Sequence, residues 1–198
     1  MSEDLTRRDL VRGTVLAVLG GGAGFLVKKA NGQIVWQVNA TRCINSRLGE
    51  VGVEACNLCT TECVVALSAV RAVNEYSKCG RCNICPAYFN VSSVVNELGQ
   101  PSEKLCPRDA IVRKPIGKVD PEDPANNFYE YIIDEEKCDG CGKCVMKCKD
   151  PLGLGSITLR VRYDKCVNCN LCAISRKCPQ DALKLLPVEQ ALQLSGIK

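Results

Sequence analysis

The chain has 198 residues, enough for one or two domains, and a formal net charge of +4. It holds 16 cysteines but only three Phe and one Trp, so its apolar core is small and cysteine chemistry must help to hold the fold together. Histidine is absent, which excludes His-ligated haem, Rieske centres, mixed Cys/His zinc sites and acid–base catalysis by histidine.

The N-terminal segment, 1–30, has the features of an export signal. Arg7 and Arg8 lie in the run T-R-R-D-L-V, which is similar to the twin-arginine motif, and an uncharged, Gly-rich apolar run follows over 13–27. That run is shorter than the roughly 20 residues that span a bilayer comfortably. Two lysines end it, and no A-x-A cleavage site follows closely. We therefore expect an uncleaved signal that anchors the protein in the membrane; the alternatives are a cleaved signal and a buried helix of a cytosolic protein.

Local patterns predict the elements of the first half, 33–114. Residues 33–42 alternate apolar and polar side chains, which predicts a strand that leads into Cys43. Residues 64–76 carry apolar side chains at short helical spacing, which predicts a helix.

A linker and further strands are predicted beyond residue 114. Residues 115–127 are rich in Pro, Asp and Asn and predict a linker or exposed loop. The second half, 128–187, is expected to contain three strands, over 128–134, 156–163 and 180–187. A short helix over 187–197 is expected to form the C-terminal tail, 188–198.

Cysteine spacing is the strongest signal in the chain. The runs C-D-G-C-G-K-C and C-V-N-C-N-L-C each contain two successive C-x2-C steps, and a fourth cysteine follows each run. This is the ligand pattern of two-cluster bacterial ferredoxins, in which the fourth cysteine of one run ligates the other cluster. The first half repeats the order of cysteines with insertions at 44–55 and 86–105. The two halves, 33–114 and 128–187, are therefore predicted to repeat each other, and the resemblance of their cysteine runs to those of two-cluster ferredoxins implies an α+β fold of two tandem ferredoxin-like units.

Applying that exchange of fourth cysteines within each half predicts four 4Fe–4S clusters that use every cysteine. The predicted ligand sets are Cys43, Cys56, Cys59 and Cys106; Cys63, Cys79, Cys82 and Cys85; Cys138, Cys141, Cys144 and Cys178; and Cys148, Cys166, Cys169 and Cys172. Three alternatives stay open: structural zinc, a disulfide framework, and fewer than four clusters. If one site differs from the others, we expect it to be the site of Cys43, because its first spacing is stretched.

Bound clusters would reverse the sign of the net charge. An oxidised four-iron cluster with four thiolates carries about −2, so four of them bring the chain from +4 to about −4. A mildly acidic protein does not suit a nucleic-acid partner.

With its T-R-R-D-L-V motif, four cysteine groups and two Cys-Pro pairs, the chain resembles the exported four-cluster iron–sulfur subunits of bacterial respiratory complexes. These belong to the dimethyl-sulfoxide reductase and nitrite reductase type. The resemblance implies a subunit that passes single electrons along four clusters, on the periplasmic side of the cytoplasmic membrane. It also implies redox partners, either a molybdopterin oxidoreductase or a flavoprotein or quinone-linked membrane subunit.

No nucleotide-binding loop or nucleophile–base pair is visible in the sequence, so we expect no catalysis by this chain alone. The alternative function is a structural or interaction subunit that zinc or clusters stabilise, without a role in electron transfer.

Overall fold

The computed structural model describes residues 34–47, 55–97, 99–123, 126–149, 154–169 and 171–194. The predicted export signal with Arg7 and Arg8, including the expected membrane anchor, lies outside these residues. Within them, no helix is long and apolar enough to cross a membrane.

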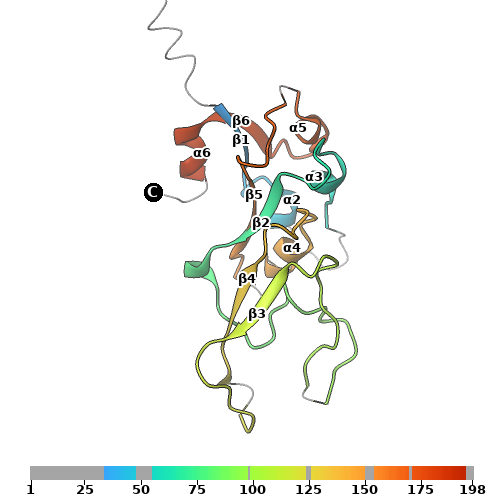
Figure 1. Cartoon of the computed structure of the whole chain (residues 1–198), viewed down its shortest axis with the longest axis vertical. Coiled ribbons are helices and arrows are strands. Elements are labelled where there is room, and N and C mark those ends of the chain that lie inside the picture. Colours follow the sequence, from blue (N-terminus) through green and yellow to red (C-terminus); the bar gives the residue numbers. More distant parts are fainter. Residues whose placement is uncertain are drawn as a thin grey trace, which may run out of the picture.

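The described residues form six strands that pair into three two-stranded antiparallel sheets. The pairs are β1 (Ile34–Val38) with β6 (Leu183–Pro187), β2 (Val70–Asn74) with β5 (Ile157–Val161), and β3 (Ile111–Pro115) with β4 (Tyr129–Ile133). The pairing is nested, since the outermost strands in the sequence pair with each other and the innermost strands do the same. Figure 1 shows the three sheets following one another along the long axis of the molecule.

This topology contradicts the predicted division into tandem units. Each strand pair joins one strand of the first half, 33–114, to one strand of the second half, 128–187. The two halves are therefore interleaved. Of the two readings of 115–127, linker or exposed loop, the described residues 116–123 fit the exposed loop, since they follow β3 in the hairpin that it forms with β4. The side chain of Asn127 closes that loop, accepting the N–H of Asp120 at 2.9 Å and donating to its carbonyl at 2.8 Å.

All the helices of the described residues are short. They are α2 (Ile44–Arg47), α3 (Leu58–Thr61), the 3-10 helix η1 (Tyr76–Lys78), α4 (Lys143–Lys149), α5 (Ala173–Lys177) and α6 (Val188–Leu194). Isolated helices shorter than about 12 residues are marginal in water, so these depend on packing for their stability. The combination of short helices and strands fits the predicted α+β ferredoxin-like class, and α6 confirms the expected C-terminal helix.

The predicted helix over 64–76 is wrong. Its second part forms β2, which pairs with β5 in the register from Val70↔Val161 to Asn74↔Ile157. Val70, Arg71 and Ala72 are all buried, so both faces of this strand are covered, with Val70 and Ala72 on one face and Arg71 on the other. Closely spaced apolar residues are compatible with a helix or with a strand. Here the main-chain hydrogen bonds with β5 stabilise the strand.

The core consists of apolar side chains from the central strands and helices mixed with cysteines. Leu159, Val145 and Val70 are among the most deeply buried side chains. They belong to one cluster with the buried cysteines Cys43, Cys138, Cys148 and Cys172. Whatever the cysteines hold therefore lies inside the core and completes its packing.

Substitution of glycine by alanine can test how closely the loop of Cys138 approaches β2, with a glycine outside that loop as the comparison. Gly140 has φ +77°, and a Cβ there would collide with the carbonyl oxygen of Val70; Gly117 has φ +83°, and no atom of the described residues comes within 4 Å of its Cβ position. We expect Gly117→Ala to cost only the left-handed conformation, roughly 1–2 kcal/mol, and Gly140→Ala to lower the melting temperature considerably more. Thermal unfolding of the two purified variants, followed by circular dichroism, makes the comparison. Equal losses would contradict the close approach.

Candidate metal centres

In the described part of the chain, four cavities are each lined by four cysteines, and all sixteen cysteines are free thiols. We name each site by its first cysteine. The Cys43 site contains Cys43, Cys56, Cys59 and Cys178; the Cys63 site contains Cys63, Cys166, Cys169 and Cys172; the Cys79 site contains Cys79, Cys82, Cys85 and Cys148; and the Cys106 site contains Cys106, Cys138, Cys141 and Cys144.

The structure corrects the predicted fourth cysteine of every set. Each predicted group of three shares one cavity, but its fourth cysteine comes from the opposite half of the chain. Cys178 joins Cys43, Cys56 and Cys59 in place of Cys106, which itself joins Cys138, Cys141 and Cys144. Likewise, Cys148 joins Cys79, Cys82 and Cys85, while Cys63 joins Cys166, Cys169 and Cys172.

Antiparallel strand pairing explains the correction. The end of one strand lies beside the start of its partner, so a cysteine that follows one strand meets a cysteine that precedes the other. Cys43 follows β1 and meets Cys178, which precedes β6. Cys138 follows β4 and meets Cys106, which precedes β3. The β2–β5 pair brings cysteines together in this way at both of its ends, which gives the Cys63 site and the Cys79 site.

Left-handed turns shape three of the four cysteine loops. The residue directly before the second cysteine has a positive φ in each, at Arg81 (52°), Asn168 (48°) and Gly140 (77°). Such a turn directs successive main-chain N–H groups toward one side, where they can face an anionic sulfur centre.

In the Cys43 site a side chain takes the place of such a turn, because residues 44–55 are inserted between its first two cysteines. Asn45 is buried, and its side chain donates to the carbonyl of Cys56 and accepts the N–H of Cys56, each at 2.8 Å. This pair of hydrogen bonds holds Cys56 beside Cys43. Asn45 could not be found from the sequence, since an asparagine within an insertion carries no ligand signal of its own.

Main-chain N–H groups donate to the isolated cysteines through a repeated motif. Both Cys106 and Cys178 begin the sequence C-P-x-D-A, and in each the Asp has a positive φ. The N–H of Ala110 then donates to Sγ of Cys106 at 3.4 Å, and that of Ala182 to Sγ of Cys178 at 3.3 Å. The repetition of this five-residue motif was visible in the sequence and marks these two cysteines as equivalent.

Two further polar groups contact sulfur in the lower part of the molecule. The N–H of Ala72 in β2 donates to Sγ of Cys138 at 3.3 Å, and the Ser156 hydroxyl lies 3.4 Å from Sγ of Cys148. Hydrogen bonds to sulfur favour the thiolate, which is the form that binds metals.

Burial acts in the opposite direction on several of the site thiols. It raises the pKa of Cys85 to about 12, and it raises the pKa of Cys144 well above the usual range. At Cys59 burial again comes first, and the nearby thiols Cys43, Cys56 and Cys178 raise its pKa further. Cavities of this kind cannot hold four thiolates without a cation, so occupation by a metal must displace protons from the thiols.

The lining of the sites points to the kind of group they suit. Each site is a cavity in which four cysteines stand among mostly apolar side chains. Among the described residues, no three His, Cys, Asp or Glu side chains converge on one point as a single metal ion requires. Four cysteines, an apolar lining and N–H groups facing sulfur fit a 4Fe–4S cluster.

The four sites lie in a row. Ile174 and Leu183 line both the Cys63 site and the Cys43 site. The Cys43 and Cys106 sites adjoin where the hydroxyl of Thr60 donates to the carbonyl of Asp139 at 2.9 Å. Helix α4 carries Cys144 of the Cys106 site and Cys148 of the Cys79 site, one turn apart. The order is therefore Cys63 site, Cys43 site, Cys106 site and Cys79 site.

The comparisons with known proteins agree with the chemistry of these sites. The family model of the 4Fe-4S binding domain matches residues 131–150, which include the run from Cys138 to Cys148. This match supports a ferredoxin-like iron–sulfur protein. Comparison with curated proteins and with solved structures gives no match.

Pairs of substitutions test which cysteines share a site. Cys178 and Cys56 belong to one site. The double variant Cys178→Ser/Cys56→Ser should therefore lose no more iron than either single variant, and all three should keep about 12 irons per chain. Cys178→Ser combined with Cys141→Ser removes two sites and should leave about 8 irons. Iron and acid-labile sulfide analysis of the anaerobically purified proteins gives the counts. The reverse pattern would support the grouping predicted from the sequence.

Proposed function

We propose that the protein is an electron carrier that holds four 4Fe–4S clusters through its sixteen cysteines. When bound, each cluster takes up and releases one electron without a change of ligands. The observation that carries the proposal is the division of all sixteen thiols into four cavities of four, each combining both halves of the chain. Sites in a row suit transfer from one end of the molecule to the other.

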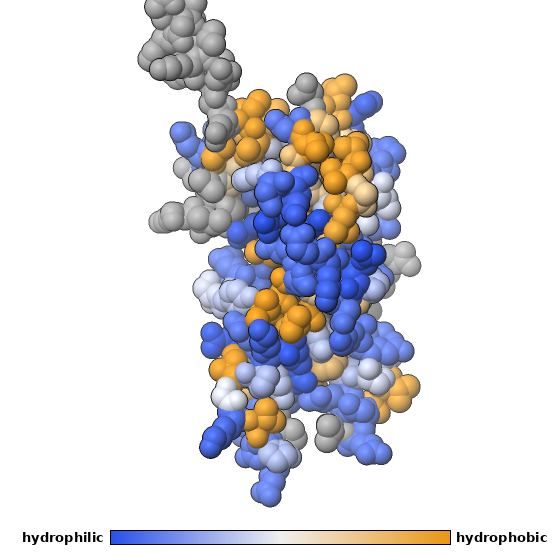
Figure 2. Space-filling model, in the orientation of Figure 1, coloured by the Kyte–Doolittle hydropathy of each residue, from blue (hydrophilic) through white to orange (hydrophobic). Residues whose placement is uncertain are grey.

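The two ends of the row carry exposed apolar side chains. Beside the Cys63 site, Val64, Val167 and Leu171 are 65%, 66% and 76% exposed. Figure 2 shows hydrophobic side chains gathered at the end of the molecule where Figure 1 places α3 and α5. At the Cys79 site, Leu154 lines the cavity and is 66% exposed. Exposed apolar groups of this kind favour contacts with other proteins, and here they would bring redox partners close to the terminal sites.

The setting of the proposed activity follows from the N-terminal sequence and the family resemblance. The pair Arg7-Arg8 supports export of the folded protein to the periplasmic side of the cytoplasmic membrane, with the uncleaved signal as anchor. There the chain would serve as an electron-carrying subunit of a respiratory complex and catalyse no reaction alone. Its partners would be a molybdopterin oxidoreductase, or a flavoprotein or quinone-linked membrane subunit.

Analysis of the purified protein tests the electron-transfer proposal. Anaerobic preparations should be brown and contain about 16 irons and as many acid-labile sulfides per chain. Their broad visible absorption should bleach on reduction with dithionite, and paramagnetic resonance signals of reduced clusters should appear. A colourless protein that contains zinc and no sulfide would refute the proposal and support the structural alternative.

Substitutions in the N-terminal segment test the export route. The double variant Arg7→Lys/Arg8→Lys should stay in the cytoplasm, because the paired arginines are the feature the pathway recognises. Protease treatment of spheroplasts should then digest the wild-type protein and spare the variant. Arg12→Lys, a change just outside the motif, is the matched control and should behave like wild type. Digestion of the double variant at the wild-type rate would argue against twin-arginine export.

A further inference from the structure

Arg71, in the middle of β2, is a buried charge. The residue is 2% exposed, and within the part of the chain that the structure describes its guanidinium donates to main-chain carbonyls alone, to Val70 at 3.3 Å and Leu67 at 3.4 Å. Among the described residues, no carboxylate lies within 4 Å of it. Burying an unpaired charge is costly, so a structure that keeps one there needs an anion nearby.

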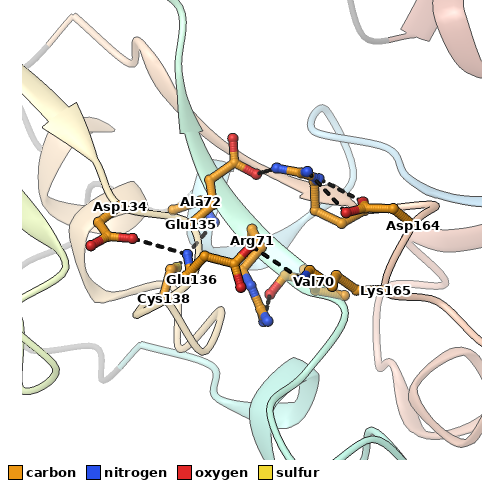
Figure 3. Close-up of polar contacts among 10 residues, drawn as sticks. Val70, Arg71, Ala72, Asp134, Glu135, Glu136, Cys138, Asp164 and Lys165 are labelled. Carbon is orange, nitrogen blue, oxygen red and sulfur yellow. Dashed lines mark hydrogen bonds and ion pairs between the residues drawn. The ribbon is translucent and has the colours of Figure 1, made fainter.

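The acidic side chains closest in the fold are already occupied. Figure 3 shows the Glu135 carboxylate directed toward an arginine beside Asp164, the Glu136 carboxylate directed toward Lys165, and the Asp134 carboxylate turned away from Arg71. The pairs are Asp134 with Lys137, Glu135 with Arg162, and Glu136 with Lys165. The Asp139 carboxylate accepts the N–H of Cys141 at 3.1 Å. None of these four carboxylates neutralises Arg71.

The neighbouring strand adds positive charge. In the register of β2 and β5, Arg71 lies directly opposite Arg160. Like charges placed opposite one another destabilise an antiparallel pair unless something compensates them. Arg160 therefore offers Arg71 no neutralising charge across the sheet.

The position of Arg71 relative to the cysteines identifies the compensating group. The next residue, Ala72, lines the Cys106 site and donates its N–H to Sγ of Cys138. The carbonyl of Val70, which accepts from the guanidinium, is also the group against which Gly140 packs in the loop of Cys138. The guanidinium thus lies at the edge of β2 that faces this cysteine loop.

We propose that Arg71 is a positioning residue that supplies a fixed, water-excluded positive charge to the Cys106 site and raises the reduction potential of the cluster held there. The inference rests on the proposed function. An oxidised cluster with four thiolates carries about −2, and one added electron makes it about −3. A cation in a medium of low dielectric stabilises the more negative state more strongly, so it favours reduction.

A redox titration followed by paramagnetic resonance tests the role of Arg71. The signal of the Cys106 site is assigned by its loss in Cys106→Ser. In Arg71→Met, the equilibrium constant for reducing this cluster should fall about tenfold, a shift of about 59 mV to more negative potential, with smaller changes at the other sites. Arg71→Lys keeps the charge and should restore most of the potential.

Lys137→Gln is the matched control. Lys137 carries the same charge and precedes Cys138 in the chain, but its side chain is 56% exposed. Water and salt screen such a charge, so the potential of the Cys106 site should stay nearly unchanged. An unchanged potential in Arg71→Met, with full iron content, would overturn the proposal. Equal shifts in Arg71→Met and Arg71→Lys would also overturn it, because they would indicate an effect of geometry and not of charge.

A second pair of variants covers the case in which Arg71→Met fails to assemble its clusters. Arg160→Glu places a carboxylate opposite Arg71 and should neutralise it without removing its hydrogen bonds, whereas Arg160→Gln removes the same arginine and adds no charge. The potential of the Cys106 site should fall further in Arg160→Glu than in Arg160→Gln. Equal potentials in the two variants would refute the role of Arg71, while absence of iron and sulfide from the wild-type protein would refute the proposed function itself.

Discussion

The antiparallel pairing of strands from the two halves of the chain is the constraint on which the rest of the structure depends. Each pair brings a cysteine that follows one strand beside a cysteine that precedes the other. The β2–β5 pair does this at both of its ends and the other two pairs at one end each, so the three pairs assemble four sites. The sites in turn hold the strands together, since two-stranded sheets are marginal by themselves. Strand pairing and the formation of the four sites therefore depend on each other.

Much of this arrangement was accessible from the sequence, because it depends on short-range patterns. Successive C-x2-C steps place three sulfurs on one loop whatever the rest of the chain does, and all the predicted groups of three share a cavity. Alternation of apolar and polar side chains correctly placed β1 and β5, and the strands predicted over 128–134 and 180–187 correspond to β4 and β6. These signals are local, and tertiary contacts did not override them.

The fourth cysteine of each site was not accessible in this way. An internal repeat suggests that each repeat is complete in itself, and assigning Cys106 to Cys43 follows from that assumption. The choice between Cys106 and Cys178 depends on whether β1 pairs within its own half or with β6, and no short-range pattern decides that. The same dependence explains the error at 64–76, where β5 determines the conformation of β2. The role of Asn45 could not be predicted either, because it depends on hydrogen bonds with Cys56 that form only in the folded chain.

The charges of the interior indicate why such a small core can be stable. Without bound metal, the cavities contain buried thiols such as Cys144, whose pKa is well above the usual range, and the central strand buries Arg71, which has no acidic partner among the described residues. Each feature alone is unfavourable, because thiolates repel one another and an unpaired guanidinium loses its hydration. An anionic centre that contains iron corrects both at once, since its metal ions stabilise the thiolates and its net negative charge stabilises the arginine. Folding and loading of the metal sites are therefore coupled through electrostatics as well as through packing, and the buried cation is part of the site as much as the cysteines are.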